Sequence, residues 1–462
     1  MNHAKENTMA TLPVEKLMMK MGVPMILSMM LQAFYNIVDS AFIANMAENG
    51  EAALNALTLA FPVQMLMVGI PIGTGVGMNA LIARNLGEGK NRDASIAAGN
   101  AEFLGALIYG AFLLFGIFGS GSYIASQTAN PLLRTLGSSY LQICCCASVG
   151  IVYFAIFEKL LQATGRAKYS TIAQISGAVT NIVLDPIMIY GLLGFPTLGV
   201  RGAAYATVIG QCVSASVGLF FHLRKNTEIE NRLSFWNPKR DVILRIYSIG
   251  VPAIIGQAMM SVMTYGLNLV LRGIDPELGE NIVTAYGLYY KVQQFILFAA
   301  FGLRDAITPI VSFSYGMEDP KRIKKGVRTG LLYTLTIMLI GLAVVELFAV
   351  PFVNAFALSG LTEGFCLSAM RIISLSFPLA GICIAFQGVF QALGGGLETL
   401  IVSLLRQVIL VLPVAYGFSL IARQNIDAVP LVFCTFLLAE GASAVIAILL
   451  YRRKRRKLKL AT

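Results

Sequence analysis

The sequence predicts an all-α polytopic membrane protein, with 12 transmembrane helices arranged as two pseudo-symmetric six-helix lobes. Three observations support this prediction: an apolar composition, a series of apolar runs of spanning length, and an internal repeat. Of the 462 residues, 56% are hydrophobic and 13% are charged, whereas soluble globular chains carry about 25% charged residues. The composition therefore indicates a chain that crosses a bilayer many times.

Each predicted helix corresponds to an apolar run long enough to cross the hydrocarbon core, which takes about 20 helical residues. The runs form two groups of six. We therefore expect an N-terminal lobe over residues 1–225, a cytoplasmic linker over 226–245 and a C-terminal lobe over 246–462 that ends in a basic tail. The predicted spans are 17–46, 53–81, 94–119, 131–156, 163–190, 199–224, 241–272, 281–308, 323–348, 362–388, 395–421 and 427–451.

The basic residues predict on which side of the membrane each loop lies. Lys and Arg concentrate in alternate loops, which is the positive-inside pattern of multi-span proteins, so both termini are expected in the cytoplasm. The net charge of +11 follows from this topology. We therefore predict no nucleic-acid partner, and membrane lipids as contacts of the basic tail. The basic segments are 5–20, 84–92, 159–168, 224–245, 321–328 and 451–459.

The two halves of the chain repeat one another. GVPMILSMMLQ from Gly22 resembles GVPAIIGQAMM from Gly250, and LLQATGRAKYSTI from Leu160 resembles VFQALGGGLETLI from Val389, at offsets of 228 and 229 residues. Because each copy has six spans, the two copies share one orientation in the membrane. Two like lobes around a central cavity are typical of alternating-access transporters.

An acidic residue inside the fifth apolar run limits the possible functions most strongly. In TNIVLDPIMIYG, Asn181 and Asp185 are four residues apart, so they share one face of a helix. A carboxylate at mid-membrane costs roughly 2.5–3.5 kcal/mol on insertion scales. Pro186 removes one backbone hydrogen bond and is a candidate hinge. Such oxygens suit a proton or a hard cation; the alternative is a polar pair that only holds neighbouring helices together.

A second acid lies on a polar seam of the first run. Gln32, Tyr35, Asn36 and Asp39 recur at steps of three and four residues, so they fall on one helix face. Asp39 lies roughly 10 Å below the outer end of its helix, a depth similar to that of Asp185. The same reasoning places a phenol and a hydroxyl in this layer. The predicted proton- or cation-binding set is Asp39, Asn181, Asp185, Thr207 and Tyr140.

The repeat serves as a control for this set. The second-half position aligned with Asp39 falls near Leu267 and Asn268, and the position aligned with Asp185 falls near Val414. Acids needed only for packing would be expected in both halves, so their restriction to one half favours a function. Two close carboxylates repel one another, and a proton or a sodium ion relieves that repulsion while the helices change packing. We therefore expect H⁺ or Na⁺ as the coupling ion.

The sequence shows no catalytic constellation, and we predict that the protein is not an enzyme. The two histidines, His3 and His222, have no metal-binding spacing, and no P-loop of the GxxxxGK[ST] type is present. We expect no cofactor apart from the coupling ion. Polar residues that are candidates for a substrate cavity are Gln32, Tyr35, Asn36, Gln257 and Asn268.

Several motifs together resemble the multidrug and toxic compound extrusion (MATE) family over nearly the whole chain. They are LQAFYNIVDSAFIA in the first run, ARNLGEG after the second, LLQATGRAKYS opening the fifth, TNIVLDPIMIYG within it and LGVRGAAYAT opening the sixth. The acid in the first helix with the Asn–Asp pair in the fifth resembles the DinF-like branch. That branch has an N-lobe cation site, which maps onto Asp39, Asn181 and Asp185.

The resemblance implies the two-lobed MATE/MOP fold and a secondary active multidrug antiporter that works by alternating access. Its substrates would be small cationic or amphiphilic drugs, exported in exchange for Na⁺ or H⁺. Its place would be a bacterial inner membrane, and we predict a monomer. The alternative within the superfamily is a flippase for lipid-linked oligosaccharides or another amphiphile. A wide cavity lined by Arg and Lys would favour the flippase, whereas the apolar and acidic residues here favour cation export.

Overall fold

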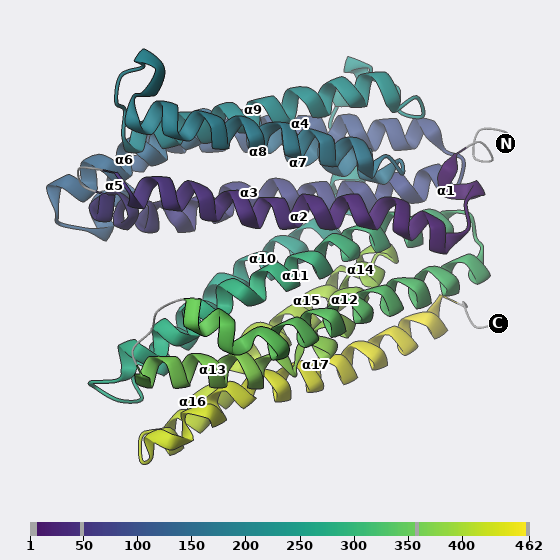
Figure 1. Ribbon diagram of the computed structural model, residues 1–462. Helices are drawn as coiled ribbons and strands as arrows, with labels where there is room; N and C mark the ends of the chain where they lie inside the picture. Colours follow the sequence, from purple (N-terminus) through teal and green to yellow (C-terminus); the bar gives the residue numbers. More distant parts are fainter. Residues whose placement is uncertain (1–6, 47–49, 356–359, 459–462) are drawn as a thin grey trace. The chain divides into compact units, whose positions relative to one another are not determined.

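The computed structural model describes residues 7–46, 50–355 and 360–458, and every regular element in these ranges is helical (Figure 1). Within them, ten helices are long and apolar enough to cross a membrane, or up to twelve spans are present if each of two bent pairs counts as one. The protein is thus a multi-pass membrane protein. The predicted all-α fold is confirmed.

The helices group into two compact units. The first contains the described residues up to Leu12 together with Met19–Ile254, and the second contains Pro13–Met18 and the described residues from Ile255 onward. Residues 226–245, predicted as a linker between lobes, fall within the first unit. The lobe boundaries taken from the sequence repeat are a separate division and stay a prediction.

The first unit consists mainly of helices that match the predicted spans. One short helix, α5, follows α4 where no element was predicted, because its polar Ser-rich sequence gives no spanning signal. The bounds are α1 (Thr8–Thr11), α2 (Val14–Ala44), α3 (Gly50–Gly87), α4 (Asn91–Phe118), α5 (Ser120–Gln127), α6 (Pro131–Cys146), α7 (Val149–Ala163), α8 (Ala167–Tyr190), the 3-10 helix η2 (Leu192–Gly194), α9 (Val200–Lys225) and the 3-10 helix η3 (Leu233–Trp236).

The second unit begins within α10 and ends in the basic C-terminal helix. Its eleventh predicted span contains a π-helical turn, η4, which interrupts the regular helix between α15 and α16. The bounds are α10 (Arg240–Arg272), α11 (Gly279–Gly316), α12 (Pro320–Ala355), α13 (Gly360–Ser374), α14 (Phe377–Ala392), α15 (Gly396–Leu404), η4 (Leu405–Ile409), α16 (Val411–Ala422), the 3-10 helix η5 (Ile426–Ala428) and α17 (Val429–Lys457).

The fourth predicted span of each half is bent. Helices α6 and α7 meet at 47°, and helices α13 and α14 meet at 52°. Val149 and Phe377, which begin the second piece of each pair, are 228 residues apart, so the bend recurs at the repeat offset. Sequence reasoning predicted each pair as one run because the apolar composition continues through the break.

Small residues let α8 and α9 approach closely. A Cβ atom on Gly177 would collide with the Ser214 side chain and the Gly210 carbonyl, and a Cβ on Gly210 would meet the backbone of Gly177 and the side chain of Asn181. Helix backbones reach such contact in membrane proteins where one or both residues lack a side chain. The crossing therefore fixes Asn181 against α9.

Two hydrogen bonds tie α2 to α8, one toward each end of the contact. The Thr171 hydroxyl donates to the Pro24 carbonyl at 2.8 Å, and the Tyr190 hydroxyl donates to the Phe42 carbonyl at 2.6 Å. The Pro24 carbonyl lies in the first part of α2, and Phe42 lies near its end. The acid of α2 and the acid of α8 lie between these two ties.

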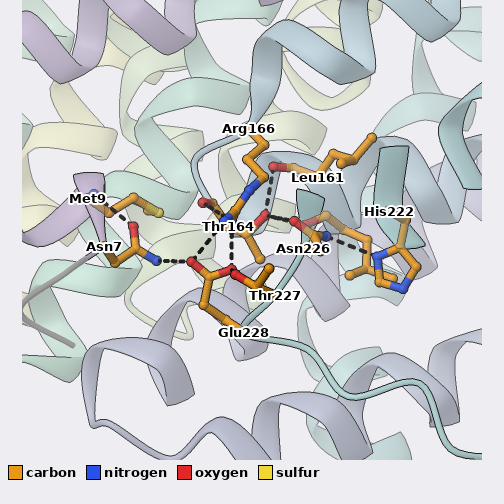
Figure 2. A network of polar contacts seen from close by, with 10 residues as sticks. Asn7, Met9, Leu161, Thr164, Arg166, His222, Asn226, Thr227 and Glu228 are labelled. Carbon is orange, nitrogen blue, oxygen red and sulfur yellow. Dashed lines mark hydrogen bonds and ion pairs between the residues drawn. The ribbon is translucent and has the colours of Figure 1, made fainter. Parts of the chain in front are cut away.

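A polar network holds the segment after α9 against the ends of α7 and α8 (Figure 2). Arg166 contacts both carboxylate oxygens of Glu228, through Nη2 at 3.0 Å and Nη1 at 2.8 Å. The Asn7 amide, just before α1, donates to the same carboxylate at 3.3 Å. The Thr164 hydroxyl donates to Asn226 at 2.5 Å. These contacts hold residues 226–228 on the first unit.

We expect Gly177→Val to destabilise the first unit by about 1–3 kcal/mol, because overpacking forces backbones or side chains apart. Thermal unfolding of the purified protein in detergent would show this as a lower midpoint. Gly110→Val is the matched control, since a Cβ on Gly110 of α4 meets no atom within 4 Å. Equal midpoints for the two variants would contradict the inferred close approach.

Candidate functional site

Two carboxyl groups and an amide meet in the interior of the first unit. Asp39 projects from α2, and Asn181 and Asp185 project from α8. The Asp39 and Asp185 carboxyl groups lie within hydrogen-bonding reach of each other. The Asn181 amide donates to Asp185 Oδ1 at 3.2 Å. Asp185 is fully buried and Asn181 is 3% exposed, so the pair on α8 is shielded from the surroundings of the protein.

The site has too few hydrogen-bond donors for its oxygens. Among the described residues, Asp39 Oδ1, Asn181 Oδ1 and Asp185 Oδ2 are buried and accept no hydrogen bond. Buried polar atoms in folded proteins are nearly always paired, and an unpaired charged group costs much more than an unpaired neutral one. Three such oxygens in one place indicate a missing positive partner, which a proton or a small cation would supply.

Two tyrosines border the acids. The Tyr35 ring, one turn before Asp39 on α2, interacts electrostatically with both carboxyl groups. Tyr140 of α6 is buried, and its hydroxyl interacts with Asp39 and accepts a hydrogen bond from the Gln64 amide at 2.9 Å. The structure therefore brings Asp39, Asn181, Asp185 and Tyr140 together, as the predicted depths suggested. Their role in ion binding stays a prediction.

A narrow cavity of about 50 Å³ adjoins the acids. Asn181 lines it together with Gln32, Tyr35 and Thr207. This volume holds a few water molecules or a small ion and is far below the 300–1,000 Å³ of a drug-binding pocket. Thr207 thus shares the cavity with Asn181, and no hydrogen bond of its hydroxyl to the acids is seen in the described structure.

The remaining candidates are distributed differently. Gln257 and Asn268 belong to the second unit, where Gln257 is exposed and Asn268 Oδ1 is buried without a partner among the described residues. The side chain of Asn36 lies outside the described residues. Helix α8 continues through Pro186 to Tyr190, and Pro186 leaves the carbonyl four residues earlier without its helical donor. Its role as a hinge stays a prediction.

Two polar residues that line the cavity were not among the candidates taken from the sequence. Glu158 of α7 and Gln174 of α8 line the same space as Asn181. Glu158 accepts a hydrogen bond from the Gln162 amide at 3.0 Å, and the Lys159 ammonium lies 3.8 Å from Glu158. Glu158 and Gln162 are four residues apart and therefore share one helix face, and this spacing was the signal in the sequence that could have identified them.

The second unit handles buried charge in another way. Arg406 of η4 and Glu440 of α17 are both buried and form several hydrogen bonds, the shortest at 2.6 Å between Arg406 Nη2 and Glu440 Oε1. This carboxylate already has a cation within the fold. Sequence reasoning missed the pair because its members are 34 residues apart and only the fold joins them.

Comparison with known families supports the fold and the sequence pattern. The MatE family profile matches residues 24–187 and 252–417. A curated relative from Staphylococcus saprophyticus, "Multidrug export protein MepA", is 26% identical over 439 residues, which cover 95% of this chain and 93% of the relative. The protein of the same name from Staphylococcus aureus is 24% identical over 451 residues, with 97% and 96% covered.

Solved structures show the same fold. A multidrug resistance MATE family transporter of the MOP superfamily, solved in an outward-facing conformation, superposes with a TM-score of 0.90 at 24% identity, with 98% of this chain and 99% of that chain covered. A MOP superfamily transporter from Pyrococcus furiosus, described as having a binding pocket of reverse polarity, gives a TM-score of 0.88 at 23% identity, with 99% of each chain covered. The predicted two-lobed MATE/MOP fold class is confirmed.

Asp39→Asn is expected to stabilise the protein in sodium-free buffer at pH 8. The amide can donate to Asp185, which replaces a contact between two acceptors by a hydrogen bond to a charged group, worth about 1–3 kcal/mol. The thermal unfolding midpoint should therefore rise. Asp93→Asn, at an exposed position in the first turn of α4, is the control and should not raise it. A lower midpoint for Asp39→Asn would contradict the donor-poor site.

Proposed function

This chain belongs to the MatE family, and on that premise we propose that it is a multidrug efflux antiporter. It exports cationic or amphiphilic small molecules in exchange for H⁺ or Na⁺. The proposal depends above all on one observation, the adjacent acids Asp39 and Asp185, each with a buried oxygen that no donor satisfies in the described structure. The relatives named as multidrug export proteins agree with this substrate class.

The acids provide the coupling. Two adjacent carboxylates in a medium of low dielectric constant repel each other strongly, so the site holds a proton or a sodium ion whenever its helices are closed around it. Carboxylate and amide oxygens are suitable for both ions. Release of the ion leaves repulsion between α2 and α8, and this repulsion favours a different packing of the two helices. Alternation between these packings links the ion to substrate movement.

The hydrogen bonds between α2 and α8 define which segment moves when the packing of these helices changes. Thr171 and Tyr190 tie α8 to α2 on either side of the acids, so the segment between the ties is free to move without separation of the helices. Pro186 lies in that segment and lacks the N–H that would stiffen it. We therefore assign the hinge to Pro186.

The setting of this activity is a bacterial inner membrane. The curated relatives are bacterial proteins, and the alternation of basic loops supports a topology with both termini in the cytoplasm. The protein works as a monomer, with lipids around its apolar surface and the basic end of α17 near anionic headgroups.

A flippase for an amphiphile of the same superfamily is the second candidate. The Pyrococcus furiosus transporter with a pocket of reverse polarity shows that members of the fold differ in this property. The cavity beside Asn181 includes Glu158, and neither Lys nor Arg is among its described lining residues. Lys159 already pairs with Glu158, so it is the Asp39 and Asp185 oxygens without a donor in the described structure that favour cation export over transport of an anionic headgroup.

We expect Asp39→Asn and Asp185→Asn each to reduce ion-driven efflux of ethidium at least tenfold. With one acid left, the repulsion between two carboxylates that links ion release to helix packing is lost. Efflux would be measured by dye fluorescence in proteoliposomes that contain equal amounts of correctly folded protein. The exposed Glu363→Gln on α13 is the control and should transport normally. Unchanged efflux by both aspartate variants would refute the coupling role.

The choice of ion is tested with separate gradients in the same vesicles. A sodium gradient at equal pH and a pH gradient without sodium are imposed one at a time, and the gradient of the coupling ion drives ethidium transport. The Asp39→Asn protein should respond to neither. If the wild type and the Asp39→Asn and Asp185→Asn proteins all transported ethidium without a gradient, transport would be facilitated diffusion. That result would contradict antiport.

A further inference from the structure

A second and larger pocket, of about 490 Å³, lies in the first unit away from the paired acids. It shares no lining residue with the cavity beside Asn181. On α7, for example, Phe154 and Glu158 face the first cavity whereas Tyr153 and Phe157 face the second. The second pocket is bounded by α4, α7, α9 and the η3 segment, and its volume is within the range of small-molecule sites.

A carboxylate without a cation lies in this pocket. Glu102 of α4 is half-buried, and its Oε2 accepts a hydrogen bond from the indole N–H of Trp236 at 2.8 Å. In the described chain no Lys or Arg forms an ion pair with Glu102. Arg232, which lies at the pocket, is paired with Glu230 at 2.9 Å. A half-buried acid with one neutral donor favours an incoming positive charge.

The walls of the pocket are aromatic. The Tyr153 and Phe157 rings lie 5.8 Å apart between centroids, and the Phe157 ring stacks on the His222 imidazole at 5.9 Å. Trp236 of η3 also lines the pocket. Aromatic faces carry negative charge density and attract organic cations, most strongly where water is excluded. The Glu102 carboxylate and the faces of the aromatic rings therefore both favour a positively charged ligand.

His222 is held in the pocket wall by contacts at both ring nitrogens. Nδ1 lies 3.0 Å from the Asn226 side-chain amide, and Nε2 lies 2.7 Å from Asn231 Oδ1. These contacts fix the ring where it stacks on Phe157.

The pocket is formed before any ligand arrives, because its linker wall is fixed by hydrogen bonds. The Asn100 amide donates to the carbonyls of Phe235 at 3.0 Å and Asn237 at 3.2 Å, and its oxygen accepts the Lys239 N–H at 2.7 Å. The network around Glu228 fixes the start of the same segment (Figure 2). A preformed wall lowers the entropy lost on binding.

We propose that this pocket is a binding site for an amphipathic organic cation with a delocalised single charge. Glu102 is the counter-ion, and Tyr153, Phe157 and Trp236 enclose the apolar body of the ligand. The site is separate from the paired acids. Binding there requires neither an ion gradient nor transport, so the inference is tested independently of the proposed antiport.

Trp236 is the natural reporter for this site, since the chain contains one tryptophan. The full-length protein in lipid nanodiscs would be titrated with tetraphenylphosphonium, and its tryptophan emission recorded. We expect a saturable change with the cation and none with tetraphenylborate, an anion of the same shape. Glu102→Gln should weaken binding of the cation about tenfold, as expected for loss of one partly screened charge interaction.

The controls separate recognition from folding. In Glu102→Gln, the side-chain amide carbonyl can still accept the Trp236 N–H, so the ligand-free emission maximum and the unfolding midpoint of this variant should match those of the parent protein. Glu277→Gln, in an exposed loop, should bind as the parent does. An unchanged titration for Glu102→Gln, or equal and non-saturating changes with both probes, would overturn the site and indicate partition into lipid.

Discussion

The first unit depends on two carboxyl groups within reach of each other, each with a buried oxygen for which the described bundle offers no donor. Asp185 is fully buried, and the one described donor to it is the Asn181 amide. A membrane bundle provides no bulk water to compensate for such a deficit. The surrounding elements keep the deficit in place. Thr171 and Tyr190 bond α8 to α2, and the Gly177–Gly210 crossing holds α8 on α9.

The described structure shows two ways of placing buried charge. In the second unit, Arg406 neutralises Glu440 through direct hydrogen bonds, and the pair needs nothing from outside. In the first unit, Asp39 and Asp185 have no fixed cation among the described residues, and the proposed antiport supplies a mobile one. A fixed pair holds helices in one arrangement, whereas a mobile ion allows the arrangement to depend on whether the ion is present. This difference is the physical basis for placing coupling in the first unit.

Helix α7 separates two polar environments of the first unit. Glu158 faces the small cavity that Asn181 lines, while Tyr153 and Phe157 face the larger aromatic pocket. The volume of the small cavity suits ions and water, and that of the larger pocket suits an organic molecule. The segment after α9 lines the larger pocket, so residues outside the predicted spans contribute to the site proposed there.

The sequence by itself determined the membrane class, the helical spans, the repeat and the residues of the acid site. Apolar runs of spanning length and rare acids inside them are strong local signals, because a bilayer tolerates few exceptions. Asp39, Asn181 and Asp185 were identified in this way. The bends at α6–α7 and α13–α14 were not, since composition does not change across them. Only the tertiary structure decided that Glu158 shares a cavity with Asn181, that Arg406 neutralises Glu440, and that Trp236 meets Glu102 across 134 residues. These contacts join distant segments, and their geometry depends on how helices pack side by side, which no periodicity along one helix encodes.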